Sequence, residues 1–202
     1  EAFRINSGGK LLIGSTTAIN VGGSSAKSQL QIEGLTGNTS SLSLIRNQNN
    51  AAGSFIRFGK TRGSSTGDAT TVADGDTLGS LTFSGADGTD IENATAAIDA
   101  VVNGTVGGNQ IPTDIVFETS ATSGNARAER VRINSSGLVG IGSDAPTHNL
   151  DIHASGNPYL KLLRSGYNPV YVGNAAGEGV IETTGDTFFK TGGTTRLRIK
   201  SD

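Results

Sequence analysis

Short runs of alternating apolar and polar residues recur along the chain, separated by Ser-Gly and other Gly-rich turns. In FRINSGGKLLIGS (residues 3–15), apolar residues flank Arg4 on both sides, which is the period of a β-strand with one buried face. A Ser-Gly turn follows, and we expect Leu11 and Ile13 to point inward on the return strand. Gly14 ends the unit, where we expect positive φ or a close backbone approach. The pattern predicts a β-hairpin.

The same string returns in the second half of the chain. VRINSSGLVGIGS (residues 131–143) places Val139 and Ile141 in the inward positions and Gly142 at the end, and LRIKSD (residues 197–202) opens a third copy. The similarity continues downstream, where further segments match in pairs: 28–34 with 148–154, 41–46 with 159–164, 55–59 with 170–173, and 114–119 with 186–191. The chain therefore consists of two tandem modules and the start of a third.

The first module is lengthened by an insertion, residues 60–112. Within it, DTLGSLTFSGADG (residues 76–88) alternates through Leu and Phe and predicts a strand before a Gly-rich turn. ATAAIDAVVNGT (residues 94–105) has the Ala content of a helix, but its alternation and its Asn-Gly pair favour a strand, which we predict. Residues 63–75, rich in Ser, Thr and Asp, are expected to form a flexible surface loop.

These patterns predict a modular organisation along the chain. The boundaries are 1–59 for a first repeat module with a hairpin and further strands, 60–112 for an inserted β module, 113–128 for a return strand and linker, 129–195 for a second repeat module, and 196–202 for the start of a third. Since the chain contains no Met, we also expect it to be a fragment of a longer protein.

Composition adds that the strands have little to bury. Of 202 residues, 30 are Gly, 5% are aromatic, and Met and Trp are absent. A globular enzyme of this length normally builds its core from a larger share of bulky side chains. Because a two-stranded ribbon is marginally stable in water and exposes unpaired edges, neighbouring repeats and other copies of the chain must cover these strands. We predict an all-β protein that associates with itself.

Several strings resemble those of bacteriophage tail fibres and related virion appendages. They are RVRINSSGLVGIG followed by HNLDIHA, and, in the insertion, FGKTRG, GDTLGSLTFSGADGTD and IVFETS. Many proteins of this family are long and end in a self-cleaving intramolecular chaperone, of which this chain shows no trace. The resemblance implies a homotrimeric, intertwined β fibre with a β-prism or β-helix-like shaft and an inserted β module. It also implies a place on the virion, other virion proteins at the fibre ends, and contact with host-cell surface glycan.

Charge and hydropathy argue against other classes of partner. The formal net charge is -2 and Lys and Arg occur singly, so we expect no nucleic acid partner. No window approaches the roughly 20 apolar residues of a membrane-spanning helix, so we expect no membrane insertion. Because Cys is absent, disulfides and thiolate metal sites are excluded, and stability must come from packing and hydrogen bonding.

Candidate cofactor and metal motifs each have a simpler interpretation. GIGSDA (residues 140–145) has the glycine spacing of a dinucleotide-binding turn, but Pro146 and a strand follow it where a helix is needed. His148 and His153 fall on opposite faces of a predicted strand, so only a symmetry axis would gather copies of one His around a metal. Asp74, Asp76, Asp87 and Asp90 lie in turns, where Asp bonds its own backbone. We expect no cofactor and no bound metal.

Three tyrosines in the second module are candidate glycan contacts: Tyr159, Tyr167 and Tyr171. Tyr can stack on a sugar ring and bond its hydroxyls, and a local packing cluster is the alternative. Four glutamates, Glu92, Glu118, Glu178 and Glu182, are candidates for a carboxylate pair, but nothing in the sequence brings two of them together. We therefore do not predict an enzyme.

The predicted function is structural and adhesive: a fibre segment that supports host attachment and receptor recognition by a bacteriophage. Three copies on one stalk give multivalent contact, so weak individual contacts combine into firm attachment. Two alternatives stay open, namely a glycan-binding module centred on residues 60–112 and a polysaccharide depolymerase with a site between chains. A bacterial trimeric adhesin is a further alternative of the same physical kind.

Overall fold

The computed structural model describes residues 3–22, 27–121, 126–162, 170–175, 178–183, 187–191 and 194–199. This part of the chain contains strands and turns and no helix, and 37% of the chain is strand, which confirms the all-β class. The strands are β1 (Phe3–Ile5), β2 (Leu11–Ile13), β3 (Leu30–Ile32), β4 (Thr77–Ser84), β5 (Ala94–Val102), β6 (Thr113–Ser120), β7 (Arg127–Ile133), β8 (Val139–Ile141), β9 (Leu150–Ile152), β10 (Tyr159–Leu162), β11 (Val170–Ala175), β12 (Glu178–Thr183), β13 (Thr187–Thr191) and β14 (Thr194–Ile199).

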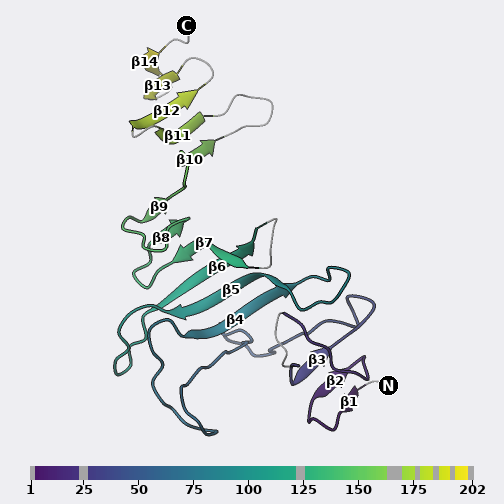
Figure 1. The fold of residues 1–202 in the computed structure, drawn as a ribbon. Helices are drawn as coiled ribbons and strands as arrows, with labels where there is room; N and C mark the ends of the chain where they lie inside the picture. The colour runs from purple at the N-terminus through teal and green to yellow at the C-terminus, as the bar shows by residue number, and fades with distance from the viewer. Residues whose placement is uncertain are drawn as a thin grey trace.

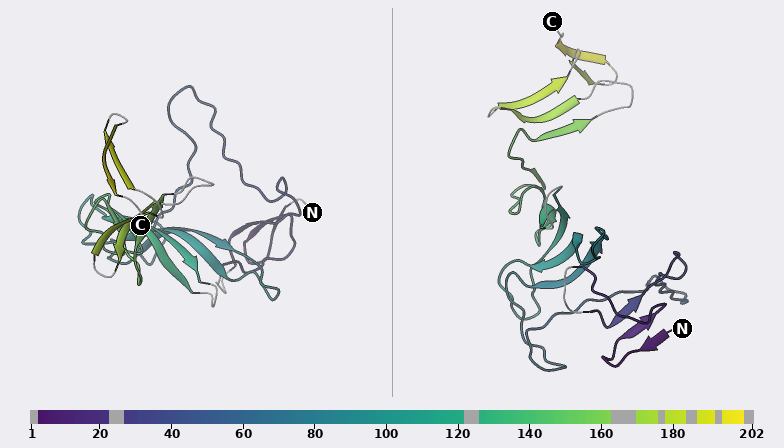
Figure 2. Two further views of the ribbon diagram at one scale, coloured as in Figure 1. Left: turned by 90° about the horizontal axis from the view of Figure 1, so that it is seen from above. Right: turned by 45° about the vertical axis from the view of Figure 1, so that its right-hand side comes forward.

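Among the described residues, these strands form four hydrogen-bonded sheets. Their strand orders are β1-β2-β3, β4-β5-β6-β7-β8-β9, β10-β11-β12 and β13-β14. The sheets follow one another along the molecule, with β1 and β14 at opposite ends (Figure 1). The two further views agree on this elongated arrangement (Figure 2).

The first sheet contains the predicted hairpin. β1 pairs antiparallel with β2, with Ile5 opposite Leu11, and β3 joins β2 in parallel, with Leu30 also opposite Leu11. Asn6 closes the turn, because its Oδ1 accepts two backbone N–H bonds from the turn at 3.0 and 3.1 Å. The hairpin prediction is confirmed, and the parallel third strand is a feature that alternation alone did not indicate.

The second copy of the string folds in the same way. β7 and β8 pair with Ile133 opposite Val139, and β9 adds in parallel with Leu150 opposite Val139. Asn134 Oδ1 again accepts two N–H bonds from its turn, at 3.0 and 2.9 Å. The repeat seen in the sequence is therefore a repeat of strand register and of turn chemistry.

Gly14 and Gly142 end the two units for the predicted reason. Their φ angles are 81° and 67°, in the left-handed region where a side chain is strained. A Cβ at Gly14 would lie 1.9 Å from the carbonyl oxygen of Glu33, and one at Gly142 would lie 2.4 Å from that of His153. Both expectations, positive φ and close approach, are confirmed at both positions.

The insertion contributes two strands to the central sheet. β4 and β5 confirm the strands predicted in residues 76–88 and 94–105, and they continue through β6 into β7, β8 and β9. β5 and β6 are joined by a longer connection than a two-residue hairpin, in which Gly107 and Gln110 form an isolated bridge. Residues 63–75 contain no strand, as expected of a loop.

Two expectations for the first module are wrong for the single chain. Residues 41–46 and 55–59, which match β10 and β11 in the repeat, form no strand although all of them are described. Leu12 is the fully buried residue of β2, whereas Leu11 and Ile13 are half-buried. Leu12 is buried because the chain after the hairpin covers its side of β2. On that side the Gln31 Oε1 atom accepts a hydrogen bond from the Ile19 backbone N–H at 3.1 Å.

Candidate functional site

The central sheet has one apolar face that extends across all six strands. Residues directly opposite each other in neighbouring strands share a face, so the register defines rows of side chains. One row is Leu81, Ile98, Phe117, Val131, Ile141 and Ile152, and the adjacent row on the same face is Gly79, Ala100, Ile115, Ile133, Val139 and Leu150. Two uninterrupted apolar rows therefore cross the sheet.

This apolar face is open to solvent in the single chain. Phe117 is 37% exposed, Leu81 is 47% exposed, and Phe83, two residues further along β4, is 56% exposed. Singly scattered apolar residues on a surface are ordinary, but a contiguous row of them indicates an interaction surface.

The opposite face is mainly polar and is buried in part. Its middle row is Ser80, Asp99, Val116, Arg132, Gly140 and Asp151. Val116 is only 3% exposed, whereas Thr82, on the same face at the edge of the sheet, is exposed. Burial on this face is therefore concentrated around the middle strands.

Asp114, which shares this covered face, is a fully buried carboxylate. Its two oxygens accept hydrogen bonds from Asn103 Nδ2 at 2.7 Å, Arg132 Nη1 at 2.5 Å and the Ser135 N–H at 2.9 Å. Arg132 also binds Glu129, and the hydrogen bonds with Glu129 and then with Asp114 raise the pKa of its guanidinium. Every partner is supplied, so the buried charge is compensated.

The N-terminal sheet repeats this arrangement on a smaller scale. Phe3 is 64% exposed and Ile5 is 70% exposed, on the face that the register gives to Leu11 and Ile13 as well. Leu12, on the other face, is fully buried. The two repeat units therefore leave the same face open.

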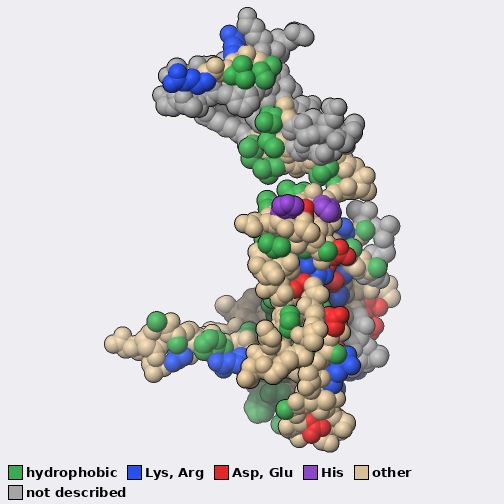
Figure 3. All heavy atoms as spheres, turned by 90° about the vertical axis from the view of Figure 1, so that its left-hand side faces the viewer, with side chains coloured by type: hydrophobic (Ala, Val, Ile, Leu, Met, Phe, Trp, Pro, Cys, Tyr) green, Lys and Arg blue, Asp and Glu red, His purple; other side chains and the backbone are tan. Residues whose placement is uncertain are grey.

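A second exposed apolar element is the arm, residues 41–58. It projects from the body of the molecule, and in the space-filling view it carries hydrophobic and basic side chains and no acidic ones (Figures 2 and 3). At its tip, the Arg46 guanidinium donates to Gln48 Oε1 at 3.0 Å and to the Gly53 carbonyl at 3.3 Å. Its two legs, 41–45 and 54–58, form no β-ladder although all of their residues are described.

The arm is seated on the apolar face at Phe58. A Cβ at Gly79 would lie 2.4 Å from the Phe58 Cβ, so only glycine allows this contact. Phe58, Leu81, Ile98 and Ile115 are among the residues that line a hollow of about 310 Å³ at this place. The arm therefore rises from the same side of the sheet that exposes the apolar rows.

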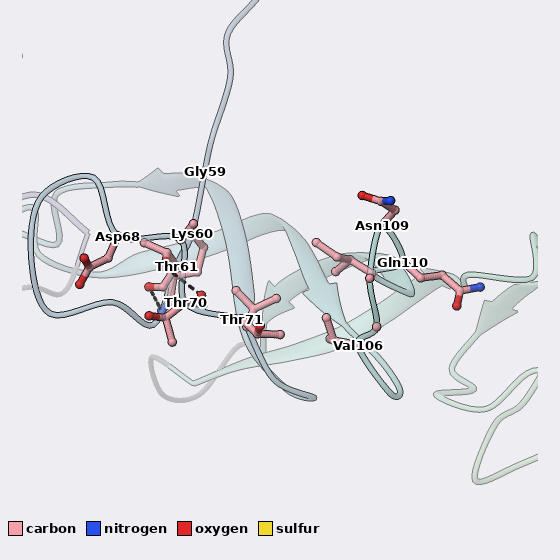
Figure 4. A pocket seen from close by; sticks show the side chains of 14 residues that line it. Gly59, Lys60, Thr61, Asp68, Thr70, Thr71, Val106, Asn109 and Gln110 are labelled. Carbon is pink, nitrogen blue, oxygen red and sulfur yellow. Dashed lines mark hydrogen bonds between the residues drawn. The ribbon is translucent and has the colours of Figure 1, made fainter.

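A pocket lies beside the base of the arm, within the insertion. Its volume is about 970 Å³, and it lies between residues 59–72 and the loop 106–111 (Figure 4). Lys60, Thr61 and Asp68 lie on one side and Asn109 and Gln110 on the other. Its lining combines amides, hydroxyls and one charge of each sign with apolar side chains that include Val72, Val106 and Ile111, and a mixed lining of this kind suits a ligand with polar and apolar faces, such as a sugar.

Asn109 in this pocket has a special backbone. Its φ is 60°, and it is the one residue other than glycine with positive φ in the described part of the chain. Asn adopts this conformation more readily than most residues with a side chain, and here it lies in the turn that the Gly107–Gln110 bridge closes. Neither the pocket nor Asn109 was among the sites predicted from the sequence, because the two loops meet only in the folded chain.

The structure brings the positions of two of the three predicted tyrosines together. Tyr159 pairs with Gly173 across β10 and β11, and Tyr171 pairs with Lys161, so the two tyrosine positions are diagonal neighbours on adjacent strands. Tyr159 is half-buried. Tyr167 lies outside the described residues.

The predicted turn aspartates do bond backbone groups. Asp87 accepts the Thr89 and Asp90 N–H groups at 2.8 and 3.2 Å, and these bonds lower the pKa of its carboxyl. The pKa of Asp76 is lowered mainly by the two-pronged ion pair with Arg62, at 2.8 and 2.9 Å. Asp74 accepts the Gly104 N–H at 2.7 Å.

The two histidines lie at either end of β9. His148 Nδ1 is 3.0 Å from the Thr147 hydroxyl, and His153 Nε2 is 3.2 Å from an Asp151 oxygen. The pKa of Asp151 is lowered chiefly by the hydrogen bond from the Thr147 N–H. The described residues contain no group of three His, Cys, Asp or Glu that could hold a metal ion.

Two of the four glutamates considered for catalysis are engaged within the chain. Glu92 accepts from Asn20 Nδ2 at 2.8 Å, and Glu118 pairs with Arg127 at 2.9 Å. The side chains of the other two, Glu178 and Glu182, lie outside what the structure describes. The described residues include no helix with the length and hydropathy needed to cross a membrane.

Comparison with known proteins adds no identity, because no protein-family model matches the chain and no curated protein matches it either.

Proposed function

We propose that this chain is a segment of a trimeric all-β fibre that supports attachment of a bacteriophage to its host cell. The observation that carries self-association is the exposed apolar face, with its row from Leu81 through Phe117 to Ile152. A surface of this kind is stable in water only when another surface covers it. The number three and the viral origin come from the resemblance of the repeat strings.

The repeated units support the fibre part of the proposal. β1–β3 and β7–β9 have the same register and the same open face, and the apolar row resumes in β10–β12, where Leu160, Val172 and Ile181 stand opposite each other. These three side chains are 47%, 43% and 56% exposed. An apolar strip that recurs along an elongated chain suits parallel copies around a shared axis.

Multi-angle light scattering with small-angle X-ray scattering tests the assembly. The purified chain is expected to have the mass of three copies and an elongated shape, and a compact monomer would sink the proposal. The biological half is tested by labelling virus particles that encode this sequence with an antibody against the chain. The label is expected on the fibres, and label on the capsid or absent from particles would contradict it.

A second candidate function is glycan recognition by the insertion, favoured by the pocket between residues 59–72 and 106–111. The pocket offers the side-chain amides of Asn109 and Gln110 as donors and acceptors for sugar hydroxyls. Replacing Asn109 by Gly and Gln110 by Ala is expected to abolish binding of the chain to host-cell polysaccharide, while the mass of the assembly in light scattering stays the same. Binding that survives both substitutions would contradict glycan recognition by this pocket.

A further inference from the structure

The connection between β5 and β6 begins with Asn103 and Gly104, the one Asn-Gly pair in the sequence. Such a pair is prone to spontaneous deamidation, because glycine has no side chain to keep its backbone nitrogen away from the asparagine amide. Asn103 is exposed to water, which the reaction consumes, whereas Val102 just before it is only 1% exposed. A chemically reactive pair therefore lies at the surface, directly after the buried end of β5.

Deamidation of this pair needs no reagent other than water. The backbone nitrogen of Gly104 attacks Cγ of Asn103, so a nitrogen–carbon bond forms, the Cγ–Nδ2 bond breaks, and ammonia leaves with the proton of the Gly104 N–H. Water then opens the cyclic imide at one of its two carbonyl carbons. The product is aspartate or isoaspartate at position 103, and in both a carboxylate replaces the neutral amide.

Both reacting groups are held by carboxylates in the folded chain. Asn103 Nδ2 donates to Oδ2 of the buried Asp114 at 2.7 Å. The Gly104 N–H donates to Asp74 Oδ1, also at 2.7 Å. Attack requires the Asn103 side chain and the peptide plane before Gly104 to rotate toward each other, and each rotation breaks a hydrogen bond to a charged group. The fold therefore opposes formation of the cyclic imide.

The deamidated side chain does not suit the site that the amide occupies. Oδ2 of Asp114 accepts hydrogen bonds from both Asn103 and Arg132. After deamidation the first of these donors is lost, and a second carboxylate faces a fully buried one. Because Arg132 also pairs with Glu129, one guanidinium would then have to compensate three carboxylates. The reaction product therefore destabilises the arrangement that protected the reactant.

We propose that Asn103 is a deamidation site that the native fold protects, and that a chain deamidated while this connection is open does not regain its full stability. The reaction releases ammonia and does not reverse in water, so the modified residue is a permanent record of opening at the end of β5. The inference is independent of the proposed trimer and of the viral role, because every group that it uses belongs to one chain.

Mass spectrometry of proteolytic peptides tests the protection. The chain is incubated at neutral pH, either folded or unfolded in guanidinium chloride, and the fraction of acid at position 103 is followed over time. We expect deamidation to be at least about tenfold faster in the unfolded chain, since one hydrogen bond to a charged group accounts for such a factor. A synthetic peptide of residues 100–107 is the control for the denaturant and should react equally in both solutions. Equal rates in the folded and unfolded chain would overturn the protection.

The hold on the nucleophile is tested by Asp74→Ala, which frees the Gly104 N–H and leaves the bonds of Asp114 in place. Deamidation of the folded chain is expected to become several-fold faster. Asp90→Ala, at another exposed turn aspartate, is the matched control and should leave the rate unchanged. Circular dichroism verifies that both variants are folded during the incubation. A rate that Asp74→Ala leaves unchanged or lowers would contradict a restraining role of Asp74.

The effect of the product is tested by Asn103→Asp, with Asn103→Ser as the matched variant that keeps a neutral donor. We expect Asn103→Asp to unfold at a clearly lower urea concentration than Asn103→Ser, or not to fold where Asn103→Ser does. The double variant Asn103→Asp with Asp114→Asn again pairs one acid with one amide, and it is expected to recover part of the loss. Equal midpoints for Asn103→Asp and Asn103→Ser would overturn the claim that the deamidated chain is less stable.

Discussion

The two faces of the central sheet are made from the same strands but differ in what covers them. The face with Asp99, Val116 and Arg132 is buried around its middle strands, and its buried carboxylate, Asp114, has hydrogen-bond partners within the chain. The face with Leu81 and Phe117 is more exposed, although Phe58 lies over part of it and Val102 at one end is buried. The two faces thus differ in how much of each the described chain buries.

The two faces also divide the chemistry of the sheet, because ion pairs and hydrogen bonds lie on one and exposed apolar side chains on the other. Hydrogen-bonded ion pairs have strict geometry, so the polar face fixes the register of the strands in each copy. The apolar face is non-directional and contributes free energy in proportion to the area covered. The four predictions below test this division, from the largest effect to the smallest.

Placing a charge in the apolar row should abolish association. Phe117→Asp removes at least about 1 kcal/mol of burial from each copy, counted three times in a trimer, and adds the cost of a desolvated carboxylate. Light scattering is expected to show monomers with unchanged circular dichroism. Thr82→Asp, on the other face, is the control and should leave the trimer intact; equal effects of the two variants would refute the division.

Removing the buried carboxylate should instead weaken folding of each copy. Asp114→Ala leaves Arg132 and Asn103 without their shared acceptor, which costs about 3 kcal/mol of unfolding free energy. The urea midpoint of the Phe117→Asp monomer measures this loss without interference from assembly. Asp114→Asn keeps a neutral acceptor and is expected to lose less, and an unchanged midpoint in Asp114→Ala would contradict the assignment.

Adding a side chain at Gly79, where Phe58 of the arm contacts the sheet, should have a smaller effect. In Gly79→Ala the new Cβ meets the Phe58 side chain, so the arm must shift, at a cost of about 1 to 2 kcal/mol. We expect a lower thermal midpoint. Gly85→Ala, where a Cβ meets nothing within 4 Å, is the matched control.

Lowering the pH should destabilise the turns that Asp76, Asp87 and Asp151 hold, rather than the packing of the apolar face. The pKa values of Asp76, Asp87 and Asp151 are lowered in the folded chain, so their stabilisation is present above the unfolded value of about 4 and lost as the pH falls through the folded values. The urea concentration at the unfolding midpoint of the Phe117→Asp monomer is expected to decrease once the pH is below about 4. Asp87→Asn should flatten that dependence slightly, and an identical slope would contradict the role of Asp87.

Much of the fold could be predicted from the sequence because its signals are local. The alternation around Arg4 and Arg132, with a turn closed by Asn6 or Asn134, defines each hairpin within about a dozen residues. β5 was predicted correctly against its Ala content, since the alternation around Ile98 outweighs helix propensity. Local period and turn chemistry are sufficient for such elements.

What could not be predicted depends on contacts between distant segments. The parallel pairing of β3 with β2 is set by the connection between them, which has no period. The polar pocket at Asn109 forms only where two loops meet. One signal was available but unused: an Asp recurs in the matching strings DIVFET and DTFFKT, at Asp114 and Asp186, which suggests a structural carboxylate.

The identical registers of β1–β3 and β7–β9 have a consequence for growth of the molecule. Each unit closes its own turn with its own asparagine and ends at its own glycine, so neither needs its neighbour to set the path of the chain. Duplicating such a unit in a gene would add one repeat unit to the chain without disturbing the fold of the others. The length of a chain built from such units can therefore change in whole steps, with each step encoded by one unit.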